Sequence, residues 1–139
     1  MIDRKIFFVD KQGEAHSYES VLSFVNNCKS FVKISNRNNE LEVFLDLIAS
    51  LVYSEEIVLL DPGFSEYEVA KLGFSENEIN QSIQVTPKMY TGFDELIETI
   101  RIRTNWRITL YTSGTTGIPK KATHTLERLV QSVQTSDNH

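Results

Sequence analysis

Apolar and polar positions change their spacing several times in the first half of the chain. The run "KIFFVD" at 5–10 is short and apolar, which is typical of a β-strand, and the polar segment "DKQGE" predicts a turn after it. Helical spacing follows Ser17, a candidate N-cap, because apolar residues then recur every three or four positions. A longer stripe within 38–54 predicts a second helix, capped by Asn38 or Asn39. These two stripes are formed by Tyr18, Val21, Leu22 and Val25, and by Leu41, Phe44, Leu45, Ile48, Leu51 and Val52.

The second half continues the same alternation. The segment 55–62 holds a continuous apolar run that ends in Asp-Pro, as expected of a strand buried in a parallel sheet. Two capping boxes, Ser65 with Glu68 and Ser75 with Glu78, predict short helices, and Gly73 predicts the end of the first one. Segments 82–86 and 106–112 have strand character. Helical spacing recurs in 93–103, capped by Asp94 or a neighbour, and again from Thr125 onward.

Strands and helices that alternate in this way predict an α/β fold with a layered, mostly parallel sheet and flanking helices. The 139 residues fit a single unit, and no internal repeat, low-complexity tract or linker divides them. We therefore treat 1–139 as one subdomain.

Composition and charge exclude several functional classes. The net charge of −5 removes the electrostatic attraction that drives general nucleic-acid binding. The lone Cys28 forms neither an internal disulfide nor a zinc site, which favours a reducing, cytoplasmic setting. The N-terminus lacks the features of a signal peptide, and no apolar run is long enough for a membrane span. We expect a folded cytoplasmic protein.

The stretch "YTSGTTGIPKK" at 111–121 carries the clearest chemistry. It follows a strand, and ligands of open α/β sheets usually lie at the carboxyl ends of strands. Glycines allow backbone N–H groups to approach an anion, and hydroxyls and a lysine add further donors and charge. The order of residues fits neither the Walker A loop nor the dinucleotide-binding fingerprint. The candidate phosphate-binding residues are Thr112, Ser113, Gly114, Thr115, Thr116, Gly117 and Lys120.

The ten residues 111–120, "YTSGTTGIPK", closely resemble the phosphate-binding signature of the AMP-forming adenylating enzymes, which include acyl-CoA synthetases, firefly luciferase and the adenylation domains of nonribosomal peptide synthetases. Weaker similarity covers "GEAHSYESV", "IVLLDP" and "THT" at 123–125. One departure is Lys121, where the family commonly has glycine.

The resemblance implies a carboxylate ligase that works in two steps. A carboxylic acid reacts with ATP and Mg²⁺ to give an acyl adenylate and pyrophosphate, and the thiol of coenzyme A or a carrier phosphopantetheine then displaces AMP. By position, residues 113–117 would hold the leaving pyrophosphate, and Lys120 would support them with its charge. The resemblance assigns no other catalytic residue and no metal ligand here.

The family's adenine site, ribose-binding aspartate, magnesium-binding glutamate and catalytic lysine have no match in this chain. We therefore expect an incomplete N-terminal part of the AMP-binding domain, without the C-terminal catalytic-lysine domain and inactive alone. Truncation would expose surface for self-association. One alternative is a non-catalytic interaction or regulatory module of the same fold, and another is a simple anion- or nucleotide-binding domain.

Several other residues have a functional and a structural interpretation. His124 is a candidate for the substrate pocket, although a single histidine more often serves packing or hydrogen bonding. Trp106 is expected in the core or at the edge of the sheet, and Cys28 is expected to be half-buried in a helix. The acidic cluster is better explained as a solvated face of short helices than as a metal site. It consists of Glu66, Glu68, Glu76 and Glu78.

Overall fold

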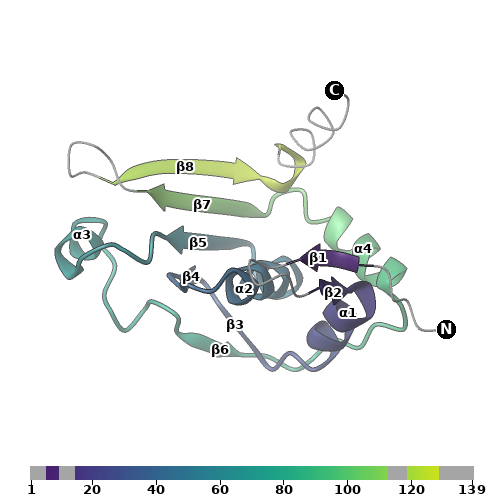
Figure 1. Ribbon diagram of the computed structural model, residues 1–139. Helices are drawn as coiled ribbons and strands as arrows, with labels where there is room; N and C mark the ends of the chain where they lie inside the picture. The colour runs from purple at the N-terminus through teal and green to yellow at the C-terminus, as the bar shows by residue number, and fades with distance from the viewer. Residues whose placement is uncertain (1–5, 10–14, 113–118, 129–139) are drawn as a thin grey trace.

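The computed structural model describes residues 6–9, 15–112 and 119–128 (Figure 1). At its centre is a four-stranded sheet in the order β4 (Ile34–Ser35), β5 (Glu56–Leu60), β7 (Arg107–Thr112) and β8 (Lys120–Thr125). The pairs β4–β5 and β5–β7 are parallel, whereas β7–β8 is antiparallel. The parallel strands all end on the side of the sheet where α3 lies.

Two smaller antiparallel pairs complete the strands. They join β1 (Ile6–Val9) to β2 (Ala15–Ser17), and β3 (Ser30–Val32) to β6 (Ser82–Gln84). The chain passes from β3 into β4 across Lys33, whose carbonyl accepts a 2.8 Å hydrogen bond from Val58 of β5. Among the described residues, two strand pairings are therefore parallel and three are antiparallel. The α/β class is confirmed, and the central sheet is mixed: β4, β5 and β7 are parallel, and the edge strand β8 is antiparallel.

In the described part of the chain, the helices beside these strands are α1 (Tyr18–Asn26), α2 (Glu40–Tyr53), α3 (Glu66–Lys71) and α4 (Phe93–Arg101). Ser17 caps α1 and Asn39 caps α2, each accepting a backbone N–H with its side-chain oxygen. Ser65 and Glu68 form the expected reciprocal capping box on α3. Gly73, at φ +89°, ends that helix, because a residue with a side chain rarely adopts this backbone conformation.

Two local predictions need correction. Ser75 and Glu78 do interact, since the Ser75 hydroxyl lies 3.0 Å from a Glu78 carboxylate oxygen, but the segment forms turns and not a helix. Gly92, rather than Asp94, occupies the N-cap of α4, where no side chain supplies a capping hydrogen bond. The helix expected behind Thr125 is confirmed as far as the described residues reach, since β8 ends at Thr125 and helical backbone follows at 126–128. The cap itself is confirmed, because the Thr125 hydroxyl accepts the Arg128 N–H at 3.2 Å.

The core is built around α2. On one side of the helix, Leu47 and Leu51 pack against Ile57 of β5 and Ile108 of β7. Ile57 is fully buried. On another side, α2 packs with α1 and α4 through a second buried cluster. Its members are Val21, Val25, Ile48, Val52, Tyr90 and Leu96. None of the helices in the described part of the chain is long and apolar enough to cross a membrane.

Trp106 joins α2 to the start of β7, as its predicted core position requires. The indole is 2% exposed, and its N–H lies 3.2 Å from the hydroxyl of Ser50, which is itself fully buried on α2. The Ser50 hydroxyl in turn donates to the Leu47 carbonyl at 2.8 Å. The helix and the sheet therefore share a polar contact inside an otherwise apolar interface.

We expect the Ser50→Ala variant to be destabilised by about 1–3 kcal/mol, because the buried indole N–H loses its acceptor. Chemical denaturation would measure the free energy of unfolding. As a control, the cost of Ser50→Ala should shrink in a Trp106→Phe background, which lacks the donor. An equal cost in both backgrounds would contradict a contribution from this hydrogen bond.

Candidate functional site

The hydroxyl- and glycine-rich loop connects β7 to β8 at the carboxyl end of the parallel core. Thr112, the last residue of β7, pairs directly with Lys120, the first residue of β8. Leu60, the last residue of β5, pairs with Tyr111, which directly precedes Thr112 in β7. Thr112 and Lys120 are both exposed. The remaining predicted site residues lie outside the described residues. They are Ser113, Gly114, Thr115, Thr116 and Gly117.

The strand register assigns Thr112 and Lys120 to one face of the sheet. Directly paired residues of antiparallel strands share a face, and faces alternate along each strand. Thr112 and Lys120 therefore share the face of Leu110, on which α2 packs. Lys121 pairs with Tyr111 on the opposite face. The two neighbouring lysines thus belong to different faces, and only Lys120 lies on the face that α2 covers.

A cavity of about 270 Å³ lies at the same edge of the sheet. Its polar lining comes from the ends of all three parallel strands, through Ser35 of β4 and Arg37 beyond it, Asp61 after β5, and Thr112 of β7. Tyr111 also contributes to it, and α2 closes one side with Val43. The rest of the wall is apolar. It consists of Leu59, Leu60, Pro62 and Leu110.

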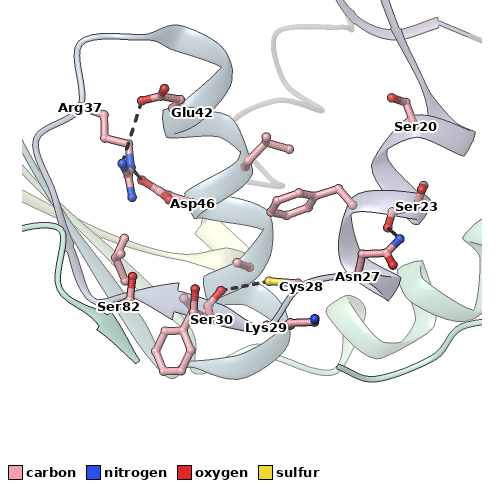
Figure 2. A pocket seen from close by; sticks show the side chains of 15 residues that line it. Ser20, Ser23, Asn27, Cys28, Lys29, Ser30, Arg37, Glu42, Asp46 and Ser82 are labelled. Carbon is pink, nitrogen blue, oxygen red and sulfur yellow. Dashed lines mark hydrogen bonds and ion pairs between the residues drawn. The ribbon is translucent and has the colours of Figure 1, made fainter. Parts of the chain in front are cut away.

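Arg37 is held in place by a carboxylate of α2 (Figure 2). Its Nε donates a 2.7 Å hydrogen bond to Oδ2 of Asp46. The Ser35 hydroxyl donates to the same oxygen at 2.8 Å. Glu42 lies 4.0 Å from Nη1. The Asp46 side chain is only 14% exposed, whereas Glu42 is 57% exposed, so Asp46 is the stronger partner. The ion pair therefore fixes the arginine at the end of β4.

The turn after β5 is also fixed. The Asp61 N–H donates to the Tyr111 carbonyl at 3.2 Å, which ties the turn to β7. The Asp61 carboxylate accepts the Gly63 N–H at 2.8 Å. The Tyr111 ring meets Phe74 edge-on, with centroids 6.0 Å apart. Both sides of the cavity are thus anchored by hydrogen bonds or by aromatic packing.

A second and larger hollow of about 620 Å³ runs along α2, bounded by α1 and β3 (Figure 2). Its charged lining comprises two cations, Lys29 and Arg37, and two carboxylates, Glu42 and Asp46. Because these charges balance, the groove does not favour anions. Arg37 lines both the groove and the cavity at the sheet edge, so it lies between them.

Cys28 lies in this groove, where it is buried at 7% exposure and donates its S–H to the Ser30 carbonyl at 3.0 Å. It follows α1 rather than lying within it, so the predicted helical, half-buried position is wrong. Burial raises the pKa of the thiol, and the nearby Asp46 carboxylate adds to this effect. A thiol of this kind is a poor nucleophile near neutral pH.

The remaining candidates have structural explanations. His124 is half-buried on β8 opposite Ile108, and it does not line either of these hollows. Glu66, Glu76 and Glu78 are exposed, as expected of a solvated face, and Glu68 completes the cap of α3. A hydrogen bond with Glu66 raises the pKa of Glu76. Among the described residues, no three side chains of His, Cys, Asp or Glu lie together as a metal site would require.

Arg37 and Asp46 were not predicted as site residues from the sequence. Two features of the sequence point to them. Arg37 closely follows the short strand at 34–35, and Asp46 is a charged residue within the apolar stretch of a helix, directly between Leu45 and Leu47. Only the fold brings them together at the edge that carries the loop.

We expect Cys28 to react very slowly with a thiol reagent such as Ellman's reagent in the native protein at pH 7 to 8. Its burial blocks access and its raised pKa keeps it protonated. Absorbance would follow the reaction, and the same protein in concentrated guanidinium chloride would show fast, stoichiometric labelling. Equally fast labelling without denaturant would contradict the buried position.

No protein-family model matches this chain, and no curated protein or solved structure is significantly similar to it.

Proposed function

We propose that this chain carries the ATP phosphate-binding loop of an AMP-forming carboxylate ligase and represents the N-terminal part of its AMP-binding domain. The proposal rests first on the ten-residue signature at 111–120. The observation that carries it further is the placement of the loop's flanks, Thr112 and Lys120, side by side at the carboxyl edge of the parallel strands. That edge is where open α/β sheets usually hold ligands.

The described flanks have the chemistry that a phosphate requires. Thr112 offers a hydroxyl donor, and Lys120 offers three N–H donors with a positive charge. Both belong to the face that also borders the cavity, so a bound phosphate would meet them from the same side. Lys121 is assigned to the opposite face and is given no role in phosphate binding. This arrangement supports the assignment of Lys120 as the supporting cation.

The proposed reaction activates a carboxylic acid with ATP and passes the acyl group to a thiol of coenzyme A or phosphopantetheine. Negative charge grows on the pyrophosphate as it leaves, and donors held in place at the loop stabilise that charge. Magnesium would neutralise part of the phosphate charge in the complete enzyme. No residue of this chain is assigned to it, because the described residues offer no suitable ligand set. The reduced, buried Cys28 fits a cytoplasmic location.

We expect the chain to bind inorganic pyrophosphate and magnesium ATP, and the double variant Thr115→Ala, Thr116→Ala to bind each at least tenfold more weakly. Hydrogen bonds to a charged ligand contribute about 1.5–3 kcal/mol each, and 1.4 kcal/mol corresponds to tenfold in affinity. Calorimetric titration would measure the dissociation constants.

The matched control is Thr109→Ala, Thr123→Ala. These two threonines pair their hydroxyls at 3.2 Å on the face of the same sheet that does not carry Thr112 and Lys120. The control should bind like the wild type. The proposal fails if the loop variant binds as tightly as the wild type, or if both double variants lose affinity equally.

A further inference from the structure

We propose that Arg37, oriented by Asp46, is a second anion contact that binds a phosphate oxygen of the ligand in the cavity at the end of β4. This inference rests on the proposed function, and it adds a residue that lies more than seventy positions before the loop in sequence. The observation behind it is that Arg37 and Thr112 line one cavity.

The geometry leaves the arginine able to bind. Asp46 takes the Nε–H at 2.7 Å, and Nη1 lies 4.0 Å from Glu42, which is beyond hydrogen-bonding distance. Within the described part of the chain, no hydrogen bond uses the N–H groups of the two terminal nitrogens of Arg37. The guanidinium is planar, so fixing one edge of it fixes the direction of the other donors. Asp46 thus lowers the entropic cost of presenting these donors to a ligand.

The anchor itself is rigid. Asp46 belongs to the middle of α2, and its Oδ2 also accepts the hydroxyl of Ser35, which is 1% exposed at the end of β4. The Arg37 side chain is 31% exposed, so it remains accessible from the cavity. A buried acceptor that holds a partly exposed arginine is the arrangement expected of a positioning pair.

The size and lining of the cavity indicate which part of a ligand it can take. A volume of about 270 Å³ lies just below the range of roughly 300–1,000 Å³ typical of small-molecule sites, so it suits a diphosphate better than a whole nucleotide. The apolar walls reduce screening by water and strengthen a contact between arginine and phosphate. Asp61 lines the cavity too, and Arg37 in the same wall offsets its negative charge.

The test is titration of inorganic pyrophosphate, in EDTA and at low ionic strength, into the full chain and three single variants. Arg37→Gln should weaken binding about tenfold, since a charge-assisted contact is lost. Arg37→Lys keeps the charge but loses the planar fork, so we expect a smaller loss of roughly threefold. Arg101→Gln is the control for net charge, because Arg101 is an exposed arginine of α4 in an ion pair with Glu98. It should bind like the wild type.

Far-UV circular dichroism would verify that each variant folds. If Arg37→Gln does not fold, the affinity of Arg37→Lys decides the test. Wild-type affinity in the folded Arg37 variants would overturn the inference. If the Thr115, Thr116 double variant still loses binding in that case, the proposed function survives without it. If Arg37→Gln and Arg101→Gln weaken binding equally, only net charge matters and the inference also fails. Absence of pyrophosphate binding by the wild type would defeat the proposed function, and the inference with it.

Discussion

The packing of α2 on the parallel strands is the interaction on which the rest of this structure depends. Ile57 of β5 has no exposed surface, and the helix covers it with Leu47 and Leu51. Fully burying one such aliphatic side chain is worth about 1.5–3 kcal/mol. Trp106 and Ser50 add a hydrogen bond within the same interface. Together these contacts set the position of the helix along the sheet.

That position determines the chemistry at the sheet edge. The helix that buries Leu47 against β5 carries Asp46 one residue earlier, where its carboxylate binds Ser35 at the end of β4 and Arg37 just beyond it. The same helix contributes Val43 to the cavity that Thr112 of β7 also lines. A single helix therefore stabilises the core and orients a cation at the edge that carries the loop.

Local signals in the sequence predicted the local structure well. Ser17, Asn39 and Ser65 cap helices as expected, and Gly73 ends one, because each of these effects depends on a few neighbouring residues. The direction of strand pairing depends on distant partners. The antiparallel pairing of β3 with β6, and of β7 with β8, was therefore not anticipated. The pairing of Arg37 with Asp46 was missed for the same reason, since it requires the fold to bring a strand end to a helix. The position of the loop at the carboxyl edge was anticipated through its flanks, while its role in phosphate binding stays a prediction.

The central claim is that the carboxyl edge of the sheet, and not the larger groove along α2, holds the phosphate ligand. Two-dimensional ¹H–¹⁵N NMR of the labelled chain, titrated with pyrophosphate, compares the two places in one experiment. Our account predicts the largest shifts at the backbone amides of 111–121 and of Arg37, with little change at Cys28 and Ser30 in the groove. Shifts concentrated at Cys28 and Ser30, or no shifts at saturating pyrophosphate, would contradict it.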